Sequence, residues 1–73
     1  DYSQALKYFR QARELDERIH ESYFGMAHTY YLMGDIKAAK KYMKLAQLRA
    51  QFDYDKLHYQ GKLATLNLLA QNR

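Results

Sequence analysis

Apolar positions recur every three or four residues along almost the whole chain, which is the spacing of one face of an α-helix. Short polar or glycine-containing breaks divide the pattern into four stripes. The first two stripes contain Ala5, Leu6, Phe9, Ala12 and Leu15, and then Ile19, Tyr23, Met26, Ala27, Tyr30 and Met33. The third and fourth contain Ile36, Ala39, Tyr42, Met43 and Ala46, continuing toward Ala50, and then Leu57, Gly61, Ala64 and Leu68. The pattern therefore predicts four helices joined by short turns, which fold as antiparallel neighbours.

Residues suited to helix ends stand at the breaks. Aspartate is a favoured N-cap because its carboxylate accepts a hydrogen bond from a free backbone N–H group of the first turn. The aspartates that precede the stripes are Asp1, Asp16 and Asp35, and, for the fourth, Asp53 or Asp55. Gly34 is expected to end the second helix, since glycine adopts the left-handed conformation that commonly closes a helix.

The composition agrees with an all-α fold. The chain has 73 residues, no proline and no cysteine, and its only β-branched residues are Ile19, Thr29, Ile36 and Thr65. Strand-forming residues are therefore scarce. The length allows one small domain, and a helical pattern that starts with the first residues leads us to expect a piece of a longer chain. No apolar run is long enough to span a membrane.

The sequence also repeats itself. A shift of 34 residues superposes Asp1 on Asp35, Ala5 on Ala39, Lys7 on Lys41, Tyr8 on Tyr42 and Ala12 on Ala46. The second and fourth stripes obey the same shift with similar residues, so that Tyr23 falls on Leu57, Ala27 on Gly61 and Tyr30 on Ala64. Five identities within the first twelve residues exceed what helical periodicity alone produces. We infer an internal repeat with this period.

Two signatures within this period carry a resemblance to a known family. Residues 23–30 read Tyr-x-x-Met-Ala-x-x-Tyr, Gly34 and Asp35 make a turn, and residues 39–46 read Ala-x-x-x-Met-x-x-Ala. This pattern resembles the tetratricopeptide repeat, a helix–turn–helix unit of 34 residues. The resemblance covers roughly residues 1–66 and implies an all-α fold of antiparallel helix–turn–helix repeats, a tetratricopeptide-like α-solenoid fragment of about four helices. It divides the chain into the second helix of a repeat (1–16), a full repeat (17–50), and a first helix of the next repeat or a capping helix (51–73).

In such repeats small residues let neighbouring helices approach closely, and large residues fill the space beside them. The residues expected in this packing are Ala5, Phe9, Ala12, Tyr23, Ala27, Tyr30, Gly34, Ala39, Met43, Ala46 and Gly61. After Ala64 the segment LNLLAQNR contains no Gly-Asp turn. The last helix is therefore expected to run on as a terminal cap.

The resemblance also implies a concave groove lined by the first helix of each repeat. Carried over position by position, its lining would be Glu21, Phe24, His28, Tyr31, Asp55, His58, Tyr59 and Lys62, with Leu32 and Thr65 at its margin. Phe24, His28 and Tyr31 share one helical face that the core stripe does not use. We predict that this row binds a peptide segment of a protein partner; alternatively, it packs against a neighbouring repeat. The lysine-rich clamp with which one subgroup of the family grips a terminal carboxylate is absent.

No group of residues indicates catalysis or a bound cofactor. His28 and His58 lie on helices expected to be neighbours, but neither a third histidine nor a carboxylate stands at a convincing ligand spacing, so no metal site is predicted. There is no Ser/His/Asp or Cys/His arrangement and no phosphate-binding loop. We therefore expect a non-enzymatic protein without cofactors. At most, the histidines suggest a contact that titrates near neutral pH.

Four lysines form a second surface feature. Lys37, Lys40, Lys41 and Lys44 repeat at helical spacing, and the formal net charge of the chain is +4. On a helix within a repeat such a stripe is by default the solvated outer face, and the alternative is contact with an anionic surface. Nucleic-acid binding is not favoured, since no aromatic residues interleave with the basic ones and no known motif is present.

The sequence thus predicts a protein–protein interaction scaffold whose preformed groove orders a peptide of its partner. The alternative is an assembly module, because the outer helices of a repeat array need covering. In that case the chain self-associates, for example as a dimer, through Tyr2, Phe9, Leu66 and Leu69. A basic face that binds an anionic surface ranks third. The absence of cysteine says nothing about the compartment.

Overall fold

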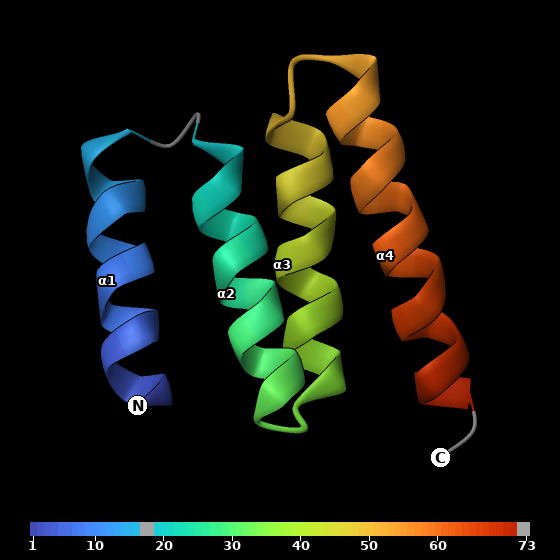
Figure 1. Ribbon diagram of the computed structural model, residues 1–73, viewed down its shortest axis with the longest axis horizontal. Coiled ribbons are helices and arrows are strands. Elements are labelled where there is room, and N and C mark those ends of the chain that lie inside the picture. Colours follow the sequence, from blue (N-terminus) through green and yellow to red (C-terminus); the bar gives the residue numbers. More distant parts are fainter. Residues whose placement is uncertain (17–18, 72–73) are drawn as a thin grey trace.

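The computed structural model describes residues 1–16 and 19–71. In these ranges the chain forms four helices and no strand, which confirms the all-α expectation: α1 (Tyr2–Leu15), α2 (His20–Leu32), α3 (Ile36–Arg49) and α4 (Asp53–Gln71). The helices stand side by side in chain order and alternate in direction (Figure 1). Each packs mainly on its neighbours in the sequence. None of the helices described is long and apolar enough to cross a membrane.

The helix ends follow the local signals in most places. The side chain of Asp1 accepts a hydrogen bond from the backbone N–H of Ser3, and that of Asp35 accepts one from Ala38 at 3.0 Å. Gly34 follows the end of α2 with a φ of 83°, the left-handed conformation expected of it. These N-caps and this turn are confirmed.

The expected role of Asp16 is wrong. Asp16 is the extended C-cap residue of α1, and α2 begins later, at His20, after an N-cap residue (Ile19) that makes no side-chain capping bond. Residues 17 and 18, which belong to the predicted break, lie outside the described residues. The first turn of α2 therefore has no side-chain cap at Ile19, and His20 within it makes the tertiary contacts described below.

The core lies mainly where α3 meets α2 and α4. The buried hydrophobic cluster consists of Tyr23, Ala27, Ala39, Met43, Ala46, Ala50, Tyr59 and Leu66. Three of its alanines, Ala27, Ala39 and Ala46, are fully buried. Because alanine carries only a methyl group, the backbones of α2 and α3 can approach closely at these positions. The cluster positions α2 and α4 on either side of α3.

Helix α1 packs on α2 through a different close approach. A Cβ atom added to Gly25 would lie 2.3 Å from Cε1 of Phe9, so the ring of Phe9 occupies the space that a side chain would need. Leu6 is the only buried residue of α1 within the described chain. Arg10 extends to α2 and donates a hydrogen bond from Nη2 to the hydroxyl of Tyr30 at 3.3 Å. Helix α1 is thus attached by few but specific contacts.

Helix α4 differs from α2 on the face that carries the repeat signature. Gly61 and Ala64 are exposed, and Leu57 is 66% exposed. A methyl group added at Gly61 would meet no described atom within 4 Å. The close packing expected at Gly61 is therefore not seen in this structure. The helix continues for 19 residues to Gln71 without a turn after Ala64, as the missing Gly-Asp signal predicts.

Candidate functional site

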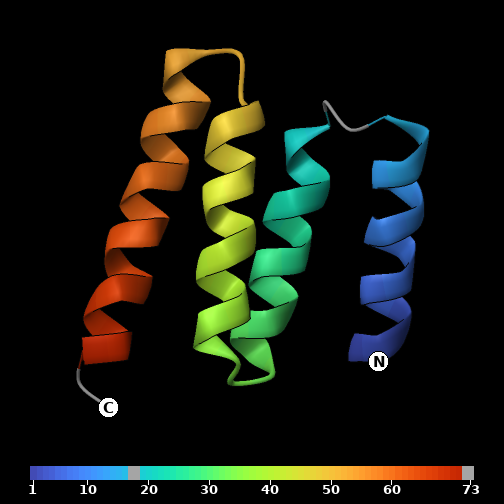
Figure 2. The same ribbon diagram turned by 180° about the vertical axis from the view of Figure 1, so that it is seen from behind.

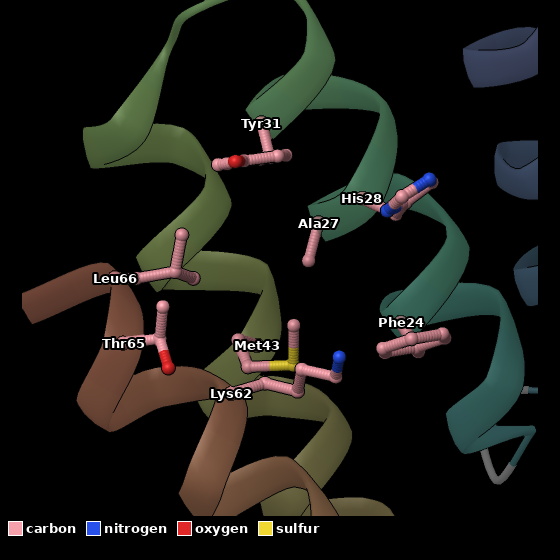
Figure 3. A pocket seen from close by; sticks show the side chains of 8 residues that line it. All are labelled: Phe24, Ala27, His28, Tyr31, Met43, Lys62, Thr65 and Leu66. Atoms are coloured by element: carbon pink, nitrogen blue, oxygen red, sulfur yellow. The ribbon is translucent and has the colours of Figure 1, made fainter. Parts of the chain in front are cut away.

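A pocket lies between α2 and α4, with α3 beneath it (Figure 3). It encloses about 200 Å³. Eight residues line it: Phe24, Ala27, His28 and Tyr31 from α2, Met43 from α3, and Lys62, Thr65 and Leu66 from α4. Ala27, Met43 and Leu66 are buried and form an apolar floor. The pocket therefore combines a rigid base from the core with a rim of larger polar and aromatic side chains.

The α2 rim of the pocket is a row of aromatic rings. Phe24, His28 and Tyr31 recur at the spacing of one helical face. The rings of Phe24 and His28 are stacked with centroids 6.4 Å apart, and those of His28 and Tyr31 are stacked at 6.5 Å. His28 and Tyr31 are exposed, while Phe24 is half-buried against Tyr59 and His58 of α4. The row thus presents flat, partly apolar surface to solvent.

The α4 rim supplies a cation and a hydroxyl. Lys62 extends from α4 toward α2 (Figure 3) and makes no ion pair with any described residue. Thr65 donates its hydroxyl proton to the carbonyl oxygen of Gly61 at 3.3 Å, so toward the pocket its oxygen can act as an acceptor. None of the eight lining residues is acidic. The pocket rim is therefore positive at Lys62.

Tyr59, which was predicted to line the open groove, is buried. Only 4% of it is exposed, and its ring lies 5.4 Å from that of Phe24, measured between centroids. Its hydroxyl oxygen lies 2.6 Å from Nδ1 of His20, at the start of α2. Burial, followed by the nearby carboxylates of Glu21 and Asp55, raises the pKa of Tyr59 to about 12. Tyr59 is therefore a neutral phenol at ordinary pH that joins α4 to α2.

His20 completes this junction, and the sequence analysis did not identify it. Its Nε2 lies 3.1 Å from a carboxylate oxygen of Glu21 and 3.8 Å from one of Asp55. A usable signal was present, since His20 precedes Phe24 by four residues and so shares the helical face of the aromatic row. The two carboxylates are thereby gathered at the end of the groove where α2 and α4 begin.

The structure separates the eight predicted groove residues into two groups. Phe24, His28, Tyr31 and Lys62 line the pocket. The other four, Glu21, Asp55, His58 and Tyr59, lie nearer the start of the two helices and surround His20 or Phe24. Sequence reasoning missed Ala27, Met43 and Leu66 as lining residues, because an apolar core position and an apolar pocket floor have the same sequence pattern.

The chemistry of this region is that of a contact surface. Within residues 1–16 and 19–71, no three histidine, cysteine or acidic side chains are arranged to hold a metal ion. The lysines of α3 form a separate feature, in which Lys41 lies 5.3 Å from the centre of the Tyr42 ring and Tyr42 stacks on Tyr30. A positively charged group over an aromatic face is attracted to it. Part of the predicted lysine stripe is therefore engaged within the fold.

One comparison with known proteins gives a match. Residues 20–53, which contain α2, α3 and the first residue of α4, match the family model described as tetratricopeptide repeat. Neither a curated protein nor a solved structure is significantly similar to the chain. The match includes the segment from which the sequence signatures were taken. The division of the whole chain at residues 16 and 50 stays a prediction.

Proposed function

We propose that this chain, in which residues 20–53 form a tetratricopeptide repeat, binds a peptide segment of a protein partner in the pocket between α2 and α4. The repeat implies a protein–protein interaction module, and no enzyme family was matched. The proposal adds the location of the contact and the form of the partner. It rests above all on the aromatic row of Phe24, His28 and Tyr31, of which the last two are exposed, beside a buried apolar floor.

Tyrosine and other aromatic side chains often contribute most of the binding energy at protein interfaces, because they offer a large contact area and lose little conformational entropy. In this chain the row is held in place from below. Phe24 packs on Tyr59, and Tyr59 contacts His20, so the rings are ordered before a partner arrives. A preordered surface binds more tightly because less entropy is lost on association.

The volume of the pocket favours a side chain over a small-molecule ligand. Sites for cofactors and drug-sized ligands usually enclose roughly 300–1,000 Å³. The pocket here encloses about 200 Å³. It suits one apolar side chain that projects from a peptide onto Ala27, Met43 and Leu66.

The charges around the groove supply an orientation. Lys62 stands at the pocket without an acidic neighbour in its lining, whereas Glu21 and Asp55 lie together at the other end beside His20. Opposite charges across an interface steer association and suppress wrong partners. A partner with an acidic residue next to its apolar anchor therefore fits the Lys62 side better than the Glu21 side.

Selection of random-sequence peptides displayed on phage tests the proposal with a defined probe. We expect selection on the unaltered chain to enrich peptides with an apolar anchor, and we expect selection on Tyr31→Ala to lose this enrichment. Phe52→Ala is the matched control, since Phe52 is an exposed aromatic residue that lies outside the pocket lining. Equal loss of enrichment in both variants, or no enrichment by the unaltered chain, would contradict the proposed site.

A further inference from the structure

We propose that copies of this chain associate head to tail, with α4 of one copy packing on α1 of the next in the way that α2 packs on α3 within one copy. This surface is distinct from the pocket, so the inference does not depend on peptide binding. It rests on two unpartnered helix faces and on the internal repeat that relates each of them to a packed one.

The first face is the outer side of α4. It consists of Tyr54, Leu57, Gly61, Ala64 and Leu68, which share one helical face. All five are exposed, with Leu57 at 66% and Leu68 at 62%. Gly61 and Ala64 lie between the two leucines and carry no side chain or only a methyl group, and no described element covers this face.

The second face is the outer side of α1. Tyr8 is 65% exposed, and Ala5, three residues earlier and half-buried, is its neighbour on the helix surface. Helix α1 stands at one edge of the molecule and α4 at the other (Figure 1), and the view from behind shows the same order (Figure 2). The two faces therefore cannot cover each other within one copy.

The internal repeat makes the two faces complementary. The 34-residue shift places α4 on α2, with Leu57 at the position of Tyr23 and Gly61 at the position of Ala27. Tyr23 and Ala27 are buried in the cluster that α2 shares with α3. The outer face of α4 is thus an α2-type surface for which no α3-type partner is present among the described residues.

The same shift places α1 on α3, with Ala5 at the position of Ala39 and Tyr8 at the position of Tyr42. Ala39 is fully buried, and Tyr42 stacks on Tyr30 with ring centroids 5.4 Å apart and planes at 6°. Because Tyr30 corresponds to Ala64, Tyr8 of the next copy would lie over Ala64. The outer face of α1 is therefore the α3-type surface that α4 lacks.

The helix directions also agree. Helix α4 runs antiparallel to α1, just as α2 runs antiparallel to α3 (Figure 1). Adding a second copy next to α4 would therefore continue the alternation of helix directions without interruption. Such a contact uses a different surface on each partner, so it does not close on itself as a symmetric dimer would. It can therefore add further copies in a row.

These observations favour a second copy as the occupant. Its α1 has the sequence pattern with which α3 packs on α2 within one copy. The residues also differ from those expected from the sequence. Leu66 is buried in the core, and Phe9 is directed onto Gly25, so neither is free for a second copy. The contact instead uses Ala5 and Tyr8 on one side and the α4 face on the other.

Sedimentation velocity over a range of concentrations tests this arrangement. The unaltered chain is expected to sediment faster as its concentration rises, without stopping at the dimer. Gly61→Glu blocks the α4 face, and Tyr8→Glu blocks the α1 face. Each variant alone should remain a monomer. Gly61→Glu is suited to this purpose because the space around Gly61 is open and glycine is a poorer helix former than glutamate.

An equimolar mixture of the two variants is the decisive sample. Each variant keeps one intact face, and the two intact faces are of opposite type, so the mixture should form a one-to-one dimer and nothing larger. Lys44→Glu, on the exposed side of α3, is the matched control and should assemble like the unaltered chain. Circular dichroism checks that all variants keep their helix content.

Three results would overturn the inference. The first is an unaltered chain that remains a monomer at every concentration. The second is assembly of Gly61→Glu or Tyr8→Glu to the same extent as the unaltered chain. The third is a mixture that stays monomeric although the unaltered chain associates, since the contact would then not join α4 to α1.

Discussion

Helices α2 and α4 occupy the same position in the internal repeat, yet they end up in different surroundings. Tyr23 and Ala27 of α2 are buried against α3, while Leu57 and Gly61 of α4, at the corresponding positions, face outward. Both helices use their other side to line the groove. The difference shows that the repeat signature marks a helix face that is able to pack. The face is buried only where a neighbouring helix lies against it.

The largest effect separating the two helices is expected from truncation of the large residue at the start of the signature. Tyr23→Ala should lower the free energy of unfolding by about 3–5 kcal/mol, since it removes a buried ring from the core. Leu57→Ala should change it by less than about 0.5 kcal/mol, because Leu57 is mostly in contact with water.

Urea unfolding followed by circular dichroism measures the Leu57→Ala value, at a concentration low enough to keep the chain monomeric. A domain of this size is only marginally stable, so Tyr23→Ala is expected to be largely unfolded without denaturant, and its remaining helix signal sets a lower limit on its cost. Equal costs at the two positions would show that α4 is packed on its outer face in solution.

The small residues at the centre of the signature should respond with opposite signs. Ala27→Leu is expected to cost about 1–3 kcal/mol, because Ala27 is fully buried and the added atoms must displace core side chains. Gly61→Ala is expected to increase the free energy of unfolding by about 0.5–1 kcal/mol, since the site is open and glycine is unfavourable within a helix. The same urea experiment measures both, and a loss of stability in Gly61→Ala would contradict the open site.

A smaller effect is expected where the two helices meet. Tyr59→Phe removes the hydroxyl that lies 2.6 Å from Nδ1 of His20. The expected cost is about 1 kcal/mol, the usual contribution of one hydrogen bond. His20→Ala should cost at least as much, because it also removes the ring packed on Tyr59. Unchanged stability in both variants would show that this contact does not contribute to the free energy of unfolding.

The pH dependence of stability provides the smallest and most selective test of the same contact. The pKa of Tyr59 is raised in the folded chain from 10.0 to about 12. Between these values the unfolded chain loses the phenolic proton while the folded chain keeps it, so folding stability falls as pH rises through this range. Tyr59→Phe lacks this proton, and its urea midpoint should fall less steeply from pH 10 to pH 12. Parallel declines in the two proteins would contradict the raised pKa.

Local features of the fold could be predicted from the sequence, whereas the different surroundings of α2 and α4 could not. The helical stripes, the caps at Asp1 and Asp35, and the left-handed Gly34 depend on residues close together in the chain. The role of Asp16 could not be predicted because aspartate is also acceptable at an extended C-cap position, and the N-cap of α2 is Ile19, which makes no side-chain capping bond.

The candidate site was predictable only in part for a related reason. The face of the aromatic row follows from helical spacing, and the structure brings Phe24, His28 and Tyr31 together in the lining of one pocket. That they bind a partner stays a prediction. Tyr59 shares a helical face with Lys62 on α4, but its depth is set by the contact with His20 across the groove. Helical spacing places His20 on the face of the aromatic row, but it does not show which residue of α4 His20 contacts.

Methionine-methyl NMR distinguishes whether a partner peptide occupies the pocket. The chain has three methionines in different surroundings: Met43 lines the pocket, Met26 is fully buried outside its lining, and Met33 is exposed near the end of α2. On addition of a peptide enriched in the phage selection, we expect a large shift of the Met43 methyl signal and little change at Met26 and Met33. Binding that shifts Met33 and leaves Met43 unchanged would contradict occupation of the pocket.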